Sequence, residues 1–162
     1  AIEASLTGHL VLSTLHTNDA PSAVTRLIEM DIEPFLVGSA LDCVVAQRLA
    51  RRLCDKCKQP YHANPDELQA LGFAVDPRMG VPTLHRPIGC QHCSNTGYRG
   101  RMALHEVMSV TEEIERLAVA RSSSAALGRA AVQQGMYTLR QDGWGKALLG
   151  MTSIEEILRV VA

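Results

Sequence analysis

The residues most able to do chemistry are four of the chain's five cysteines, which stand as two pairs of equal spacing. Cys54 and Cys57 form one C-x2-C unit, and Cys90 and Cys93 form the other. Two such units complete the tetrahedral four-sulfur site that Zn²⁺ prefers. The absence of haem or ferredoxin spacing favours zinc over iron. Because four sulfurs leave no open position, the metal is predicted to be structural.

Other interpretations of these residues stay open. Free thiols or a redox pair would account for one C-x2-C unit more easily than for two. Three histidines could each replace a cysteine as ligand: His62, His85 and His92. Three cations near the pairs would offset the thiolate charge: Lys56, Lys58 and Arg101. Cys43 stands apart on a predicted helix and is expected to be a small core residue.

The cysteine pairs open and close a segment, residues 54–100, that is rich in Pro and Gly. One small helix is predicted in it, with Asn64 as N-cap and Gly72 as terminator. The rest has few apolar residues, so zinc binding of about 10–16 kcal/mol would dominate its stability. Arg48–Leu53 and Arg101–Met108, on either side, are predicted strands of one ladder, since the second alternates with a period of two.

The elements around this segment predict an α/β fold. The apolar run His9–Leu15 predicts a buried strand. The turn after it has Asn18 or Asp19 as N-cap and Pro21 near the first helical position. A second helix is predicted from Pro34 to about Gln47.

The region after Thr111 is predicted to be a packed helical bundle. Four helices are expected, beginning at Thr111, in the serine cluster 122–124, at Thr138 and at a capping box formed by Thr152 and Glu155.

Composition excludes several classes of protein. The net charge of −1 gives no general attraction to nucleic acid or anionic lipid. No apolar run approaches the roughly 18 residues of a membrane span, and no signal peptide is visible. Five cysteines without a secretion signal indicate a reducing compartment. A chain that opens with Ala1 and not Met is expected to be processed or cut from a longer protein.

The segment Thr7–Ser22 resembles the histidine box of the secretion ATPase superfamily. Further stretches narrow the resemblance to the type II secretion and type IV pilus assembly ATPases: Arg26–Ile28, Glu33–Phe35, Val45–Leu49, Arg51–Cys54, Gly97–Arg101 and Leu139–Gly143. The paired cysteines fit the same family. The resemblance covers essentially the whole chain and is loosest over residues 62–88. Asp42-Cys43 and His105 depart from the family pattern.

The resemblance implies three parts. Residues 1–53 would be the C-terminal part of a RecA-like P-loop motor core, 54–100 a zinc-binding insertion, and 101–162 a returning strand and helical subdomain. Such proteins assemble as hexamers at the inner face of the cytoplasmic membrane, next to an inner-membrane platform protein. There they use ATP and Mg²⁺ to drive polymerisation of pilin or pseudopilin subunits.

This chain itself is predicted not to hydrolyse ATP. It contains no G-x-x-x-x-G-K-[ST] phosphate loop, and the acidic magnesium-site motif of the family is also missing. The stretch Gly143–Lys146 does not have the spacing of a phosphate loop, and it lies in a predicted helix.

The two box histidines are expected to have different roles. Seven residues of strand span about 23 Å, so His9 and His16 do not easily contact the same phosphate. Ligands of α/β sheets lie at the carboxyl ends of strands, which places His16 at the nucleotide. The resemblance makes His16 the candidate γ-phosphate sensor, with Thr14 a weaker candidate beside it. For His9, a nucleotide contact and a packing or hydrogen-bonding role both stay open.

Two alternatives from other classes remain. A zinc-dependent nucleic-acid module would use a basic stretch: Arg48, Arg51, Arg52, Lys56 and Lys58. Against it stand the near-neutral charge and the lack of interleaved aromatic residues. An interaction module would instead dock the platform protein or neighbouring subunits.

Overall fold

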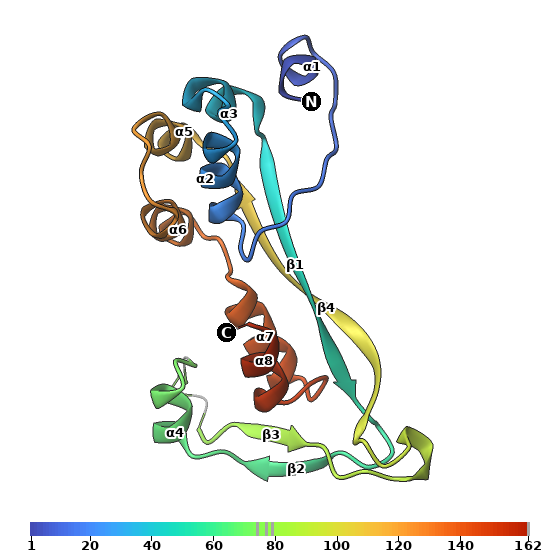
Figure 1. Cartoon of the computed structure of the whole chain (residues 1–162). Helices are drawn as coiled ribbons and strands as arrows, with labels where there is room; N and C mark the ends of the chain where they lie inside the picture. Colours follow the sequence, from blue (N-terminus) through green and yellow to red (C-terminus); the bar gives the residue numbers. More distant parts are fainter. Residues whose placement is uncertain (74, 77, 79, 162) are drawn as a thin grey trace. The chain divides into compact units, whose positions relative to one another are not determined.

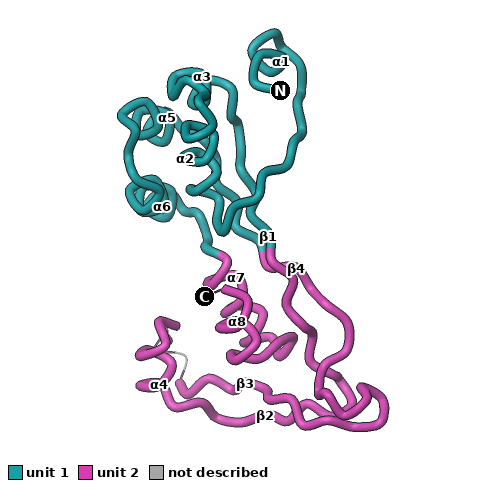
Figure 2. Tube along the Cα trace, in the orientation of Figure 1, with its two compact units in different colours: residues 1–47, 105–138 teal, residues 48–104, 139–162 magenta. Residues whose placement is uncertain are grey.

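The computed structural model describes residues 1–73, 75–76, 78 and 80–161, which form a mixture of helices and strands (Figure 1). They divide into two compact units, residues 1–47 with 105–138 and residues 48–104 with 139–162 (Figure 2). Strands β1 (Cys43–Leu53) and β4 (Tyr98–Ser109) pair in a two-stranded sheet and each contributes to both units. This pairing confirms the predicted ladder. The three-part division by function, 1–53, 54–100 and 101–162, stays a prediction.

The first unit contains the helices α1 (Ile2–Leu6), α2 (Pro21–Glu29), α3 (Pro34–Ala40), α5 (Glu112–Val119) and α6 (Ser124–Gln133). Its buried side chains include Val24, Val37, Ile114 and Leu127. The predicted helix starts at Pro21, at Thr111 and in the serine cluster are confirmed, but the N-cap of α2 is Ala20 and not Asn18 or Asp19. The hydroxyls of Thr111 and Ser123 accept the N–H groups of Ile114 and Ala126, and Pro21 takes the first position of α2.

The predicted strand His9–Leu15 is wrong. The segment has no regular secondary structure, and the side chains of Leu10 and Leu12 are 86% and 88% exposed. An apolar strand is stable inside a sheet only when neighbouring strands satisfy its backbone and cover its faces. Over the described ranges, the strands pair only as β1 with β4 and β2 with β3, so this run has no partner.

The predicted helix Pro34–Gln47 is also wrong in its second half. Helix α3 ends at Ala40 and β1 begins at Cys43. The β-branched pair Val44 and Val45 favours a strand, and pairing with the distant β4 decides the outcome. Cys43 therefore lies exposed on a strand, and its predicted place in a helical core is a further error.

The second unit contains β2 (Gln59–His62), β3 (Thr83–Arg86), α4 (Pro65–Ala70), the 3₁₀ turn η2 (Gln91–Cys93), α7 (Leu139–Leu148) and α8 (Ile154–Val160). Strands β2 and β3 are antiparallel, with Gln59 opposite Arg86. Asn64 caps α4 by accepting the N–H of Asp66, and Gly72 follows the helix with a φ of 77°, as predicted.

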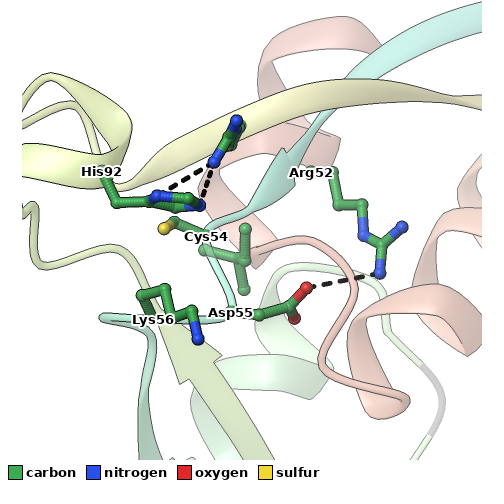
Figure 3. A pocket seen from close by; sticks show the side chains of 7 residues that line it. Arg52, Cys54, Asp55, Lys56 and His92 are labelled. Carbon is green, nitrogen blue, oxygen red and sulfur yellow. Dashed lines mark hydrogen bonds and ion pairs between the residues drawn. The ribbon is translucent and has the colours of Figure 1, made fainter.

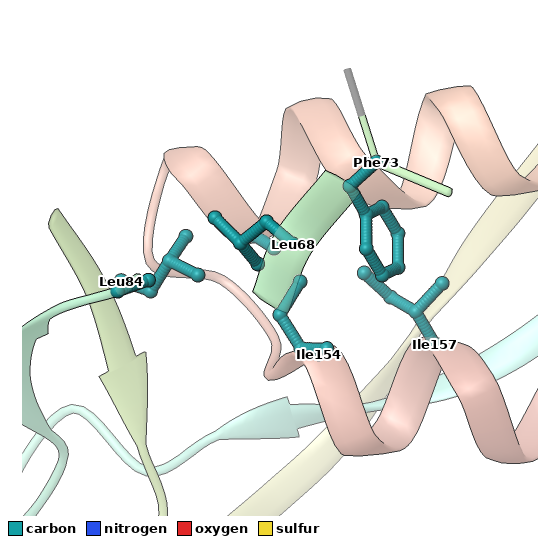
Figure 4. Close-up of a cluster of buried hydrophobic side chains, with 7 residues drawn as sticks. Leu68, Phe73, Leu84, Ile154 and Ile157 are labelled. Carbon is teal, nitrogen blue, oxygen red and sulfur yellow. The ribbon is translucent and has the colours of Figure 1, made fainter. Parts of the chain in front are cut away.

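The core of this unit joins the cysteine-flanked segment to the last two helices (Figure 4). Leu68, Phe73 and Leu84 pack with Ile154 and Ile157. Phe73 also lies against Trp144, with ring centroids 5.2 Å apart. The segment therefore contributes buried side chains to a core that it shares with helices far along the chain, and the prediction that it lacks core residues is not borne out.

The predicted capping box of α8 is wrong, because the N-cap is one residue further along the chain. Ser153 is the N-cap, and its hydroxyl accepts the N–H of Glu156. The hydroxyl of Thr152 donates instead to the main-chain carbonyl of Arg51 at 2.9 Å. A tertiary partner on β1 therefore takes the side chain that local spacing assigned to the cap.

The four C-terminal helices are divided between the units, with α5 and α6 in the first and α7 and α8 in the second. The helical terminal subdomain stays a prediction. Across the part of the chain that the structure describes, no helix combines the length and apolar character needed to cross a membrane.

Candidate metal centre and histidine segment

The four predicted cysteines come together in the second unit. The sulfurs of Cys54, Cys57, Cys90 and Cys93 all lie within 4.8 Å of one another. The Sγ–Sγ distance is 4.0 Å from Cys54 to Cys90, and 3.8 Å from Cys93 to both Cys57 and Cys90. The two pairs, far apart in sequence, therefore form one group.

These distances fit a zinc ion bound by four sulfurs. A Zn–S bond of about 2.3 Å places the corners of a regular tetrahedron about 3.8 Å apart. A disulfide would require a separation of about 2.05 Å, and all the cysteines are free thiols. The donor set and its spacing are consistent with a structural zinc site.

Two tight turns present the sulfurs. In the first, Cys54 directly follows β1, and its carbonyl accepts the N–H groups of Cys57 and Lys58 at 3.2 and 3.0 Å. In the second, the carbonyl of Cys90 accepts the N–H groups of Cys93 and Asn95 at 3.1 and 2.9 Å. The N–H of Cys54 donates to the carbonyl of Gly97 at 2.9 Å, which holds the turns together.

The surroundings favour opposite protonation states for two of the thiols. Burial raises the pKa of Cys57 to about 11. Burial also acts to raise the pKa of Cys93, but the N–H groups of Cys90 and Gly97 donate to its sulfur and hold its pKa at about 6. Cys93 is thus prepared as a thiolate, whereas a bound metal would have to displace the proton of Cys57.

Gly97 is required by the geometry of this site. Its φ is 76°, and a Cβ at this position would lie 2.4 Å from the Cβ of Pro87. The same residue donates its N–H to the Cys93 sulfur at 3.2 Å. Only glycine combines this backbone conformation with such close packing.

A basic pocket of about 330 Å³ lies beside Cys54 (Figure 3). Its charged and titratable lining is Arg52, Asp55, Lys56, His92 and Arg99. Of the three predicted neighbouring cations, Lys56 lines this pocket. Lys58 instead donates to Asp55 at 2.8 Å and to the carbonyl of Gly150 at 2.9 Å, and Arg101 is exposed on β4.

The histidines lie outside the sulfur group among the described residues. His92 contacts Arg99, and His62 lies 3.4 Å from the Thr83 hydroxyl. The ring of His85 packs against Gly150. The structure therefore does not support histidine as a replacement ligand.

The three candidate nucleotide contacts, His9, Thr14 and His16, all lie exposed in the irregular segment. His9 has hydrogen-bonding partners: its Nδ1 lies 3.1 Å from the Thr7 hydroxyl and 3.2 Å from the carbonyl of Ala4. These contacts match the hydrogen-bonding role left open for it. The roles of His16 and Thr14 stay predictions.

The Gly143–Lys146 stretch lies inside α7, as predicted. The ammonium group of Lys146 binds Asp142 and donates to the carbonyl of Ala103 at 2.8 Å. The stretch is therefore part of a helix with its lysine engaged, and not a phosphate loop.

Two buried carboxylates were not anticipated from sequence. Glu106 accepts the main-chain N–H of Ala20, and Glu156 binds Arg51 and Arg159. The signal for Glu106 was present, because it lies between Leu104 and Met108 on the buried face of β4. A carboxylate on an apolar face needs buried donors.

Comparison with known proteins identifies the family. The family model described as type II/IV secretion system protein matches residues 1–159. Type II secretion system protein E of Pseudomonas aeruginosa is 49% identical over 160 residues, covering 99% of this chain and 31% of that protein. The type IV pilus assembly ATPase PilB of Thermus thermophilus is 48% identical over 158 residues, covering 98% and 18% respectively.

PilB of Myxococcus xanthus is 47% identical over 158 residues, covering 97% of this chain and 28% of that protein. The chain thus spans less than a third of the length of each of these relatives. The match over nearly all of its residues shows that the chain belongs to the type II/IV secretion system protein family.

Proposed function

We propose that this chain is the C-terminal portion of a hexameric cytoplasmic ATPase that powers type II secretion or type IV pilus assembly. Relatives at 45–49% identity carry both of these names, which supports the assignment to this pair of machines. Residues 1–53 would complete a RecA-like motor core, 54–100 form the zinc module, and 101–162 add the returning strand and helical subdomain. The complete protein would act at the inner membrane face with a platform protein.

The zinc module has a structural role in this proposal, and the sulfur cluster is the observation that carries it. Cys54 directly follows β1, and Cys93 lies shortly before β4. A Zn²⁺ ion bound by the four sulfurs would therefore close the detour between two paired strands. When bound, the metal supplies cross-linking and no open coordination position for a substrate.

The histidine segment, Thr7–Ser22, would contact the nucleotide. His16 would sense the γ-phosphate of ATP bound with Mg²⁺ by other parts of the complete protein, with Thr14 and His9 as further contacts. The exposure of His16 supports this role, because its ring is accessible to a ligand. The phosphate loop would come from residues outside this chain.

ATP turnover by the complete ATPase tests the proposal. We expect His16→Ala to lower kcat by at least about tenfold, the range for losing one group that stabilises transition-state charge. His62→Ala, which removes another exposed histidine, is the matched control and should leave turnover unchanged. A His16→Ala protein that folds, binds zinc and hydrolyses ATP at the parent rate would overturn the sensor assignment.

A second candidate is a zinc-stabilised interaction module that docks an inner-membrane platform protein. The pocket beside Cys54 favours it, because Arg52, Lys56 and Arg99 present positive charge to solvent. Retention of the isolated chain on the cytoplasmic domain of the platform protein, lost in Lys56→Glu, would support docking. Salt-dependent retention on DNA would support nucleic-acid binding instead.

A further inference from the structure

Within the first unit, the histidine segment is bound near its end by a buried carboxylate from β4, the strand that follows the zinc module. Glu106 on β4 is 4% exposed, and its Oε1 accepts the main-chain N–H of Ala20 at 2.8 Å. Ala20 is fully buried and lies shortly after His16. We infer that Glu106 is a positioning residue, which acts through Ala20 to fix the location of His16. This inference rests on the proposed function.

The hydrogen bonds at the start of α2 show how tightly this anchor is built. Pro21 has no N–H group, so the main-chain donors here belong to Ala20 and Ser22. Each donates to a carboxylate at 2.8 Å, Ala20 to Glu106 and Ser22 to Asp19. The hydroxyl of Thr17 donates to the carbonyl of Asp19 at 3.0 Å. The turn immediately after His16 is therefore fixed, although residues 9–16 have no regular structure.

The chemistry of the anchor explains why a glutamate stands at this position. A carboxylate forms a stronger bond to an N–H group than a neutral acceptor does. The positive end of α2 adds to that attraction. Glu106 lies between Leu104 and Met108 on the buried face of β4, and its side chain reaches Ala20. Alanine would leave the N–H of Ala20 buried without this acceptor, whereas glutamine would keep an uncharged acceptor of the same length.

A double-mutant cycle in the complete ATPase tests the inference. Glu106→Ala should lower kcat by about 10- to 100-fold, as expected when a catalytic group is misplaced by about 1 Å. KM for ATP should change little, since the residue does not contact nucleotide in this account. Glu106→Gln should recover part of the loss. Glu112→Ala, which removes an exposed carboxylate from the same unit, should have no effect.

The double mutant shows whether Glu106 acts through His16. In a His16→Ala background, Glu106→Ala should cause no further loss of kcat, because the group that it positions is gone. Losses that multiply, or an unchanged kcat for Glu106→Ala, would overturn the inference. Zinc content and the melting temperature check folding, and if the alanine variant does not fold, the cycle is run with Glu106→Gln. Full activity of His16→Ala alone would instead refute the proposed role of His16 as phosphate sensor, on which this inference rests.

Discussion

Glu156 on α8 binds Arg51 on β1 through three hydrogen bonds. The main-chain N–H of Arg51 donates to Oε1 at 2.8 Å, and its Nε and Nη2 donate to Oε2 at 2.9 and 2.7 Å. Arg159 adds two more bonds to the same buried carboxylate. The Arg51 guanidinium also lies 4.2 Å from the centroid of the Tyr98 ring. These contacts fix the end of the strand that leads into Cys54.

Glu156→Gln should destabilise the protein in a pH-dependent way. Burial acts to raise the pKa of Glu156, but hydrogen bonds from Arg159 and Arg51 outweigh it and hold the pKa at about 2, against an ordinary 4.5. The stabilisation is therefore complete above pH 4.5 and is lost as the pH falls toward 2. At pH 7 we expect the variant's free energy of unfolding to be about 3 kcal/mol lower.

Denaturant titrations of both proteins across this pH range measure the effect. Zinc content is measured for both proteins at each pH, and the difference between their free energies of unfolding at matched zinc content is the quantity to follow. It should shrink as the pH falls from 4.5. A difference that is the same at pH 7 and pH 3 would contradict this role of the Glu156 carboxylate.

Cys93→Ser should abolish stoichiometric zinc binding, because the serine hydroxyl replaces a sulfur prepared as a thiolate. Cys43→Ser is the matched control, since Cys43 is exposed on β1 outside the sulfur group. Metal analysis after dialysis should find one zinc per chain in the control and a small fraction of that in Cys93→Ser. Equal zinc in both variants would rule out Cys93 as a ligand.

Gly97→Ala should weaken zinc binding, whereas Gly100→Ala should not. Both glycines have a φ near 77°, so each substitution pays the left-handed backbone cost of about 1–2 kcal/mol. Only at Gly97 does the added Cβ meet another residue, at 2.4 Å from Pro87, and displace the N–H bound to Cys93. Competition with a chromophoric chelator gives the two zinc affinities. Indistinguishable affinities would contradict this account of the turn.

Ile157→Ala should loosen the cysteine-flanked segment although it lies on the C-terminal helix. Ile157 is fully buried among side chains of that segment, so truncation should cost about 2–5 kcal/mol. Hydrogen exchange should rise in β2, β3 and α4. Leu149→Ala, which truncates a side chain that is 73% exposed, is the control. Unchanged exchange in these elements would mean that the segment is stabilised independently of α8.

Helix caps could be predicted from the sequence, but pairing between distant segments could not. The caps at Asn64, Thr111 and Ser123 were predictable because a cap depends on residues a few positions away. The fate of Val44 and Val45 depended on β4, which is distant in sequence, so a helix was predicted where a strand forms. Thr152 was assigned to a cap because its competing partner, Arg51, lies on another strand.

The same contrast between local spacing and distant contacts holds for the candidate site. The cysteine pairs were recognisable because a metal imposes its own spacing on the chain. Glu106 and Glu156 were missed because a carboxylate is ordinarily exposed, and donors from Ala20 and Arg51 are distant from them in the sequence. The segment His9–Leu15 was predicted as a strand from its apolar pattern alone, but among the described residues no strand pairs with it.

Zinc K-edge X-ray absorption of the protein purified without chelators tests the central claim most directly. The account predicts one zinc ion per chain with four sulfur neighbours at about 2.3 Å. Protein without zinc, or zinc with nitrogen or oxygen in place of any of these sulfurs, would contradict it.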